Sequence, residues 1–444
     1  MKTKVGFVSL GCAKNLVDTE TMLARLAAAG YEITPDEAEA DVIVVNTCAF
    51  IESAKQESID TILDLAWLKE HHKLRGLVVT GCLAERYGEE ILRDLPEADA
   101  VVGLGSADRL VEAVEAVLAG ERGWRASGDK EAAPLGGDRV LTTEGFAYLK
   151  VAEGCDNRCS YCAIPLIRGK MRSRPIEDLV KEAKDLEALG VKELCLIAQD
   201  TSRYGLDLYG AYRLPELIRA ITAETKIPWI RLLYLYPDKI TDELIAEMRD
   251  NPRVVKYADL PVQHISDAVL ARMGRHGGSD VIRSAVARLR AAIPGITLRT
   301  TVMVGFPGET EEDFRALCRF VKETKFDRLG AFAYSPEENT PAASFPDQIS
   351  EQEKQDRCDE VMRIQLGVSA RRGKSFVGKT LRVLCEGFDI PAGVYVGRSE
   401  ADAPDVDGKV FFRSDKKLAY PRFVDVTIEE AEDYDLIGRN VSLL

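Results

Sequence analysis

Short apolar runs alternate with helical patterns through the first 120 residues, and this order restricts the fold more than any other feature of the chain. Strands are expected at the apolar runs Val5–Leu10, Val42–Val45, Gly76–Thr80 and Val101–Gly103. Helices are expected after them, at residues 16–29, 53–68, 84–92 and 106–118. Because strand and helix alternate, we expect an α/β domain over residues 1–120, with a parallel sheet covered by helices.

One cysteine follows each of the first three expected strands, within three residues of its end. These are Cys12, Cys48 and Cys82. The carboxyl ends of parallel strands lie at one edge of a sheet, where ligands bind, so we expect the three thiols to meet there. A lone free cysteine is often a small buried hydrophobe, whereas three at equivalent strand ends indicate a ligand set. Soft thiolates favour an iron–sulfur cluster or zinc, and three of them leave one metal position open.

The ten cysteines of the chain have no context for a disulfide framework. The first residues lack the apolar core and cleavage site of a signal peptide, and no run approaches the length of a membrane span. We therefore expect a cytoplasmic protein with reduced thiols and no membrane partner.

A second cysteine group lies beyond a polar linker expected at residues 121–140. A strand expected at Phe146–Val151 leads into Cys155-x-x-x-Cys159-x-x-Cys162. This spacing lets three thiolates hold one small cluster, and the second Cys-x-x-Cys pair typical of zinc sites is missing from the sequence. Three thiolates on a four-iron cubane leave one iron open, which can chelate S-adenosylmethionine (SAM). Tyr161 is then expected to lie against the adenine.

The second group resembles the cluster motif of the radical SAM superfamily, because it opens a series of strand–helix units over residues 141–372. Further strands are expected at Glu193–Ala198, Ile230–Tyr234, Val255–Leu260, Thr297–Val304 and Arg328–Ala333. We expect an open (β/α) barrel with its site at the carboxyl ends of the strands, as in closed barrels. Gln199 closes one of these strands and is expected to contact the cofactor.

The whole chain resembles the methylthiotransferase family. The matching segments are Gly11–Asn15, Asn46–Cys48, Thr80–Cys82, Cys162–Pro165, Arg168-Gly169, Arg172–Arg174 and Gly305–Thr310. The resemblance implies that the amino-terminal cysteines bind a second [4Fe–4S] cluster, so that the cofactors are two clusters and SAM. It also implies insertion of sulfur into an unactivated C–H bond followed by methylation, with SAM as radical source and methyl donor. An electron donor and a sulfur donor are then needed as partners.

Three segments resemble the branch of this family that acts on ribosomal protein S-twelve. They are Ser9–Asp18, Ala198–Gly205 and Gly397–Pro404 together with Asp407-Gly408. The resemblance implies methylthiolation of the β-carbon of an aspartate in that protein, within the small ribosomal subunit. Two alternatives stay open: a transfer-RNA adenosine methylthiotransferase, and a non-enzymatic iron–sulfur module that docks on ribosomes.

The charge balance bears on this choice. The chain has 59 Lys plus Arg against 73 Asp plus Glu, a net charge of −14, which disfavours direct binding to nucleic acid. A small β-barrel is expected over residues 373–444, with strands at Thr380–Glu386, Gly393–Gly397, Lys409–Phe412 and Phe423–Ile428. Such barrels often bind nucleic acid through basic grooves, but residues 375–444 carry nine basic and thirteen acidic side chains, 9 − 13 = −4. An acidic barrel suits a basic ribosomal protein.

The remaining candidates are single residues. At least one of Arg168, Arg172 and Arg174 is expected to bind a carboxylate of SAM or substrate, and Arg168 is our candidate for the cofactor. No catalytic side chain is expected beyond the cluster ligands. Cys195 lies in an expected strand and Cys318 in an expected helix, so both are expected to be buried.

Overall fold

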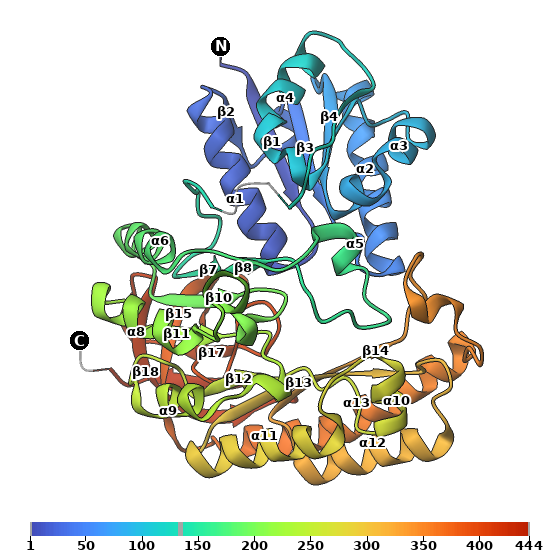
Figure 1. Cartoon of the computed structure of the whole chain (residues 1–444). Helices are drawn as coiled ribbons and strands as arrows, with labels where there is room; N and C mark the ends of the chain where they lie inside the picture. The colour runs from blue at the N-terminus through green and yellow to red at the C-terminus, as the bar shows by residue number, and fades with distance from the viewer. Residues whose placement is uncertain (1, 132–135, 443–444) are drawn as a thin grey trace. The chain divides into compact units, whose positions relative to one another are not determined.

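The computed structural model describes residues 2–131 and 136–442, which divide into two compact units (Figure 1). The first unit comprises Met1–Thr142, Ala152–Arg172 and Ser335–Ala343, and the second comprises Thr143–Val151, Ser173–Tyr334 and Ser344–Leu444. The loop that carries the second cysteine group thus belongs to the same unit as the amino-terminal cysteines. No helix within the described residues is long and apolar enough to cross a membrane.

The first unit contains a six-stranded sheet in which every neighbouring pair is parallel. Its strand order is β2-β1-β3-β4-β5-β6, with bounds Glu32–Thr34, Lys4–Ser9, Val42–Thr47, Gly76–Gly81, Ala100–Val102 and Trp124–Ala126. The expected parallel sheet is confirmed. The edge strands β2 and β6 were not expected, because each is a short segment that contains polar or charged residues and does not form an apolar run. β6 lies inside the expected linker.

Helices cover both faces of this sheet, as Figure 1 shows. Two of them, α1 (Ala13–Ala28) and α4 (Leu110–Leu118), pack on one face together with side chains such as Val44 and Val78. The other face carries α2 (Glu52–His71), α3 (Cys82–Asp94) and the short α5 (Ile164–Arg168). Every residue of β3 and β4 is buried, which explains why the central strands read as continuous apolar runs.

The second unit contains six parallel strands in two three-stranded sheets, ordered β11-β10-β7 and β12-β13-β14. Their bounds are β7 Phe146–Lys150, β10 Glu193–Ile197, β11 Trp229–Leu232, β12 Tyr257–Asp259, β13 Thr297–Val304 and β14 Arg328–Ala333. All six expected strands are present, and the bridge between Ile230 and Val254 connects the two sheets. The expected open barrel is therefore confirmed.

Helices follow the strands of the open barrel, as in a series of βα units. They are α6 Ile176–Ala188, α7 Leu206–Tyr209, α8 Leu214–Glu224, α9 Asp242–Asp250, α10 Asp267–Arg272, α11 Gly278–Ala292, α12 Glu311–Thr324 and α13 Glu351–Lys374. Short 3-10 helices lie at residues 37–39, 104–109, 201–203, 237–239 and 341–344, and the two-residue strands β8 and β9 lie at Ala152–Glu153 and Arg172–Ser173. The sequence of α12 begins with a capping box, in which Thr310 and Asp313 satisfy each other's backbone N–H groups.

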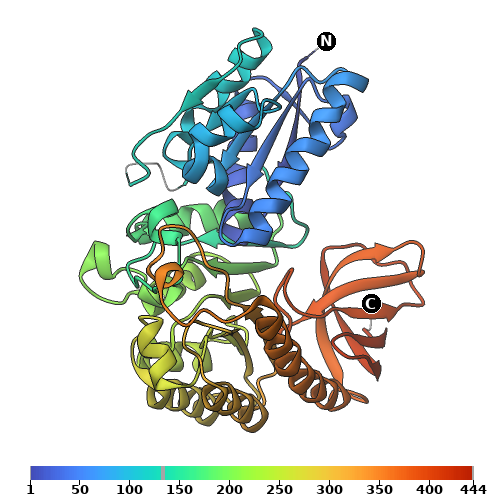
Figure 2. The ribbon, with the colours of Figure 1, turned by 90° about the vertical axis from the view of Figure 1, so that its right-hand side faces the viewer.

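A closed five-stranded barrel follows α13, drawn in orange to red in Figure 2. Its strands are β15 Thr380–Asp389, β16 Val394–Ser399, β17 Val410–Arg413, β18 Arg422–Ala431 and β19 Leu436–Asn440. The expected small β-barrel is confirmed, with β19 as an additional strand. Ten buried side chains fill its interior, among them Val410, Phe412 and Val426.

A buried ionic network joins this barrel to the amino ends of the open-barrel strands. Arg398 of β16 forms an ion pair of 2.6 Å with Glu193, the first residue of β10. The other oxygen of Glu193 lies 2.6 Å from Nε of Arg231 in β11, and Arg231 also donates to the Glu400 carbonyl at 2.9 Å. Both arginines and Glu193 are almost inaccessible to solvent. Removal of one partner would leave an unpaired buried charge, which typically costs about 3–5 kcal/mol.

The loop after β16 extends this network with three aspartates. Asp402 forms an ion pair with Arg328 of β14, and Asp407 accepts a 2.6 Å hydrogen bond from the Tyr257 hydroxyl. Asp405 accepts from the Tyr148 hydroxyl at 3.0 Å. The segment Gly397–Pro404 with Asp407-Gly408, which carried part of the family resemblance, therefore anchors the barrel to the core.

Candidate functional site

The three amino-terminal cysteines follow adjacent strands of the first sheet. Cys12 is the residue before α1 and follows β1, Cys48 follows β3, and Cys82 is the first residue of α3 after β4. The strands β1, β3 and β4 are neighbours in the sheet, so the three thiols start from one edge, as the sequence predicted. Cys48 and Cys82 are buried, and Cys12 is exposed.

Asn15 ties together the loops that carry these cysteines. Its Nδ2 donates to the carbonyl of Leu10 at 3.0 Å and to the carbonyl of Thr47 at 2.9 Å. The Sγ of Cys82 lies 3.6 Å from Asn15 Oδ1. Asn15, in the first turn of α1, is thus a cross-link between the strand ends.

Glycines permit the close approach of these loops. Gly81 has φ +93°, and a Cβ there would lie 2.3 Å from the side-chain oxygen of Asn46 and 2.5 Å from the Thr47 carbonyl. Gly11 has φ +90°, and a Cβ there would lie 3.1 Å from the sulfur of Cys48. Both positions require glycine because of their left-handed backbone and the atoms beside them.

Burial and mutual repulsion keep the inner thiols protonated in the protein alone. Burial raises the pKa of Cys82 to about 12, and the nearby thiols of Cys12 and Cys48 add to the rise, while Arg168 opposes it. Burial also raises the pKa of Cys48, with a contribution from Cys12.

The second cysteine group forms a tight loop in the same unit. The N–H of Cys155 donates to the Gly169 carbonyl at 3.1 Å, and the N–H of Cys162 donates to the Cys159 carbonyl at 3.0 Å. Gly154 has φ +76°, and a Cβ there would lie 2.0 Å from the Lys170 carbonyl oxygen. These contacts hold the backbone on both sides of the loop. Tyr161, the expected adenine neighbour, is buried in this loop.

Arg168 connects the two cysteine groups within the first unit. Its Nη1 lies 2.9 Å from Oε2 of Glu153 and 3.1 Å from Oδ2 of Asp18. Its Nη2 donates to Asn15 Oδ1 at 2.5 Å and lies 3.6 Å from the sulfur of Cys82. Glu153 lies two residues before Cys155. The Arg168 guanidinium therefore contacts Cys82 of the first cysteine group and a residue next to the second group.

The other arginines of this stretch have different neighbours. Arg174, in the second unit, forms an ion pair of 2.7 Å with Glu182. Arg172, in the first unit, donates to the Lys130 carbonyl at 2.6 Å. Gln199 follows β10 at the carboxyl end of the strand, as the sequence predicted. Cys195 in β10 and Cys318 in α12 are buried, which confirms the expectation for both.

A buried carboxyl beyond the carboxyl end of β13 was missed by the sequence analysis. Glu309 Oε1 forms an ion pair of 2.8 Å with Arg357 of α13, and Oε2 accepts from the Phe306 N–H at 3.3 Å. The Nε2 of His264, from the segment after β12, lies 3.8 Å from Glu309 Oε2. Glu309 lies in the segment Gly305–Thr310 that carried part of the family resemblance, but no local pattern pairs it with His264 or Arg357, which come from distant parts of the chain.

Burial shifts both titrating groups of this cluster toward their neutral forms. It raises the pKa of Glu309 to about 7 against the opposing charge of Arg357, and it lowers the pKa of His264 to about 4. The pKa of Glu309 is higher in the folded state than in the unfolded state. Its contribution to the free energy of unfolding is therefore complete below about pH 4.5 and is lost as the pH rises through 7. His264 has the opposite sign, because the folded state binds fewer protons than the unfolded state between pH 4 and 6.5.

We expect Glu309→Gln to remove the carboxyl contribution alone. The free energy of unfolding of the variant minus that of the unsubstituted protein should increase by about 3 kcal/mol as the pH rises from 4.5 to 7. Urea unfolding at a series of pH values measures this difference. Glu312→Gln, at an exposed position of α12, is the control and should show no such trend. A pH-independent difference for Glu309→Gln would contradict the assignment.

Three family models match consecutive parts of the chain. Residues 4–103 match UPF0004, described as an uncharacterised protein family, residues 149–321 match the radical SAM superfamily, and residues 377–441 match the TRAM domain. The radical SAM superfamily implies a [4Fe–4S] cluster and SAM. The fold and these matches define a radical SAM enzyme with a cysteine-bearing amino-terminal domain and a carboxyl-terminal TRAM barrel.

Curated relatives align with nearly the whole chain. The ribosomal protein uS12 methylthiotransferase RimO of Geobacter sulfurreducens is 51% identical over 447 residues, 99% of this chain and 99% of the relative. That of Lachnoclostridium phytofermentans is 49% identical over 436 residues, 98% of this chain and 99% of the relative. The chain therefore belongs to the uS12 methylthiotransferase family, which confirms the resemblance seen in the sequence.

Solved structures share the fold at low sequence identity. The radical S-adenosylmethionine methyltransferase TsrM from Kitasatospora setae, with cobalamin and a [4Fe–4S] cluster bound, superimposes with a TM-score of 0.55 and 18% identity, covering 77% of each chain. The cobalamin-dependent radical enzyme OxsB gives a TM-score of 0.50 and 13% identity, covering 82% of this chain and 56% of the other.

The ligand roles of the six cysteines stay predictions, as do the cofactor contacts of Tyr161, Gln199 and Arg168. Among the residues that the structure describes, no three histidine, cysteine or carboxylate side chains lie close enough to hold a single metal ion. What the structure shows is that the two cysteine groups belong to one unit, with Arg168 bonded beside both.

Proposed function

We propose that this protein methylthiolates the β-carbon of an aspartate in ribosomal protein uS12. The observation that carries the proposal is identity of about 50% over nearly the whole chain to enzymes named for that reaction. A ribosomal substrate places the reaction in the cytoplasm. An electron donor and a sulfur donor are further proposed partners, because C–H thiolation consumes both electrons and sulfur.

Two [4Fe–4S] clusters are proposed, one on Cys155, Cys159 and Cys162 and one on Cys12, Cys48 and Cys82. The donor sets fit such clusters, because each consists of three thiols without oxygen ligands. When bound, a cluster with SAM supplies the one-electron chemistry that opens an unactivated C–H bond, which no positioned base can do.

The protein's own contribution is to hold these groups and exclude water. Asn15 fixes the loops after β1 and β3, and the buried surroundings of Cys48 and Cys82 keep solvent from two of the thiols. Arg168 neutralises part of the negative charge that thiolates would bring, because its guanidinium is buried beside Cys82. No further acid or base is required of the side chains.

The barrel supplies a surface suited to a basic substrate protein. Its exposed carboxylates Glu429, Glu430, Glu432 and Asp433 lie in or just after β18. Ribosomal proteins are basic, so these carboxylates would attract uS12 during approach. Three other acids of the tail, Glu386, Asp402 and Asp407, are used in the buried network and do not serve docking.

Mass spectrometry of ribosomal particles tests the proposed function. The anaerobically reconstituted enzyme, supplied with SAM, reductant and sulfide, should add one methylthio group to an aspartate of uS12 in small subunits. Unfractionated transfer RNA in a parallel reaction is the control and should gain no mass. A mass gain in transfer RNA alone would refute the substrate, and binding without SAM cleavage would assign the chain to a non-enzymatic module.

A further inference from the structure

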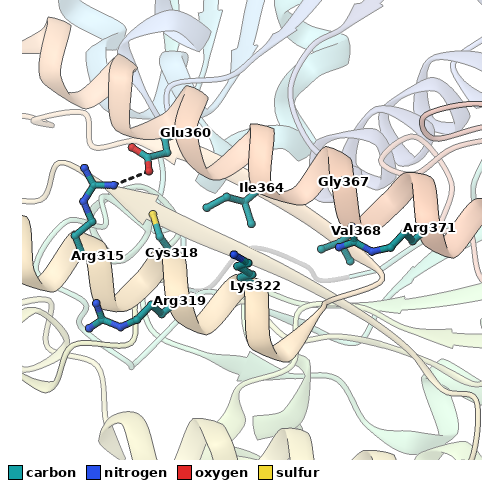
Figure 3. A pocket seen from close by; sticks show the side chains of 9 residues that line it. All are labelled: Arg315, Cys318, Arg319, Lys322, Glu360, Ile364, Gly367, Val368 and Arg371. Carbon is teal, nitrogen blue, oxygen red and sulfur yellow. Dashed lines mark hydrogen bonds and ion pairs between the residues drawn. The ribbon is translucent and has the colours of Figure 1, made fainter.

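A basic groove lies between α12 and α13 in the second unit, with a volume of 480 Å³ (Figure 3). Its walls consist of one face of each helix, with residues four and seven apart along α12. The lining residues are Arg315, Cys318, Arg319, Lys322, Glu360, Ile364, Gly367, Val368 and Arg371. Four of these are cations and one is an acid, in a chain whose net charge is −14.

The charges in this basic groove are unevenly compensated. Arg315 forms ion pairs with Glu311 at 2.6 Å and with Glu360 at 2.7 Å, the second of which is drawn in Figure 3. The three other cations, Arg319, Lys322 and Arg371, are exposed. No carboxylate of the described residues forms an ion pair with any of these three. Their positive charge is therefore available to an external anion.

The shape of the groove depends on a residue that the helix itself disfavours. Gly367 stands in the interior of α13, where glycine is a poor helix former. A Cβ there would meet only Arg371 Nη1, at 3.8 Å, so packing does not demand glycine. Because Gly367 has no side chain, the groove stays open beside its apolar floor, which is formed by Ile364 and Val368.

We propose that this basic groove binds the RNA phosphate backbone of the small ribosomal subunit. The proposal rests on the proposed function, because the particle that carries uS12 is covered with RNA phosphates. A protein of net charge −14 is repelled by such a particle unless a local basic surface faces it. The groove is such a surface, and it revises the expectation of no nucleic-acid contact that the total charge suggested.

The chemistry of the groove suits backbone contact rather than base recognition. Arginine and lysine on a helix face bind phosphates as charges, without reading sequence. The floor of Ile364 and Val368 accepts the apolar side of a ribose or base. Bound counterions are released from RNA on binding, so the contribution of the groove depends on salt in a defined way.

The test compares two triple variants of the reconstituted holoenzyme. Arg319→Ala/Lys322→Ala/Arg371→Ala removes the uncompensated cations, and alanine favours the helices that carry them. Lys181→Ala/Lys226→Ala/Lys409→Ala removes three exposed lysines elsewhere in the same unit and is the matched control. Binding to purified small subunits and to a single-stranded RNA oligomer is measured by fluorescence anisotropy between 50 and 200 mM salt.

The slope of log affinity against log salt should be smaller in magnitude by about 2 for the groove variant than for the unsubstituted enzyme. Each of the three phosphate contacts that are lost contributes about 0.7 to this slope. The unsubstituted enzyme should therefore lose about 20-fold more affinity over this salt range than the groove variant. The control should keep the full slope. A charge-reversed variant, Lys322→Glu/Arg371→Glu, should bind less tightly than the alanine variant.

Two outcomes would overturn the proposal. One is equal binding and slope in the groove variant and the unsubstituted enzyme. The other concerns polyglutamate, measured in the same way as a model of an acidic protein. If the groove variant loses binding to polyglutamate but keeps its binding to RNA, the groove is assigned to an acidic protein. Modification of isolated uS12 separates this proposal from the function, because the groove variant should retain it. If the unsubstituted enzyme modifies neither isolated nor ribosomal uS12, the proposed function fails, while the salt slope still decides the groove.

Discussion

Replacing Cys155 by alanine should abolish SAM cleavage, whereas replacing Cys12 should leave it intact and abolish thiolation. The reason is that the two cysteine groups are proposed to hold separate clusters with separate roles. Cys155→Ala should retain the iron of the amino-terminal group, and Cys12→Ala should retain that of the second, so each falls from about eight irons per chain to about four. Iron analysis and deoxyadenosine release measure both effects.

Cys318→Ala is the matched control for this pair, because Cys318 is a buried cysteine in α12 outside both groups. It should keep about eight irons and full SAM cleavage. An unchanged iron content in Cys12→Ala would contradict the convergence of strand ends on which the second cluster rests. Loss of SAM cleavage in Cys12→Ala would contradict the division of roles.

Arg168→Ala should destabilise the protein lacking its cofactors by about 3–5 kcal/mol, because it removes a buried cation from its partners, among them Glu153. Arg168→Lys should recover only part of this loss, since an ammonium cannot bond to Glu153, Asp18 and Asn15 with the geometry of a guanidinium. The denaturation midpoint in urea measures stability, and iron content after reconstitution measures cluster assembly.

A variant with three substitutions separates the effect of Arg168 on stability from its effect on cluster assembly. The triple variant Arg168→Met/Glu153→Gln/Asp18→Asn removes the cation together with both carboxylates and should recover part of the stability, but it should still assemble clusters poorly because the guanidinium beside Cys82 is gone. Arg109→Ala, which removes an exposed ion pair with Glu112, is the control and should change neither property. Normal cluster assembly in the triple variant would show that Arg168 acts through stability alone.

The architecture followed from the sequence wherever the pattern was local and long enough. The strands β13 and β14 have the expected bounds, Thr297–Val304 and Arg328–Ala333, because each is a long run between clear helical segments. The convergence of Cys12, Cys48 and Cys82 followed from the rule that parallel strands end at one edge. That expectation needed only the order of elements and no contact between side chains.

What the sequence could not show were contacts between distant segments. Glu309 and His264 become a buried pair only when the segments after β12 and β13 lie side by side. Arg168 was a candidate for a carboxylate of the cofactor, but its partners in the structure lie 15 and 150 residues away, at Glu153 and Asp18. A charge count likewise missed the basic groove, because the sum over a chain does not record where charges gather.

Buried ion pairs and a hydrogen bond make the TRAM barrel a fixed part of the second unit. Arg398, Asp402 and Asp407 bind Glu193, Arg328 and Tyr257, so these buried contacts connect the barrel directly to the strands of the open barrel. A partner that binds the barrel is therefore held at a fixed place relative to the strands of the open barrel.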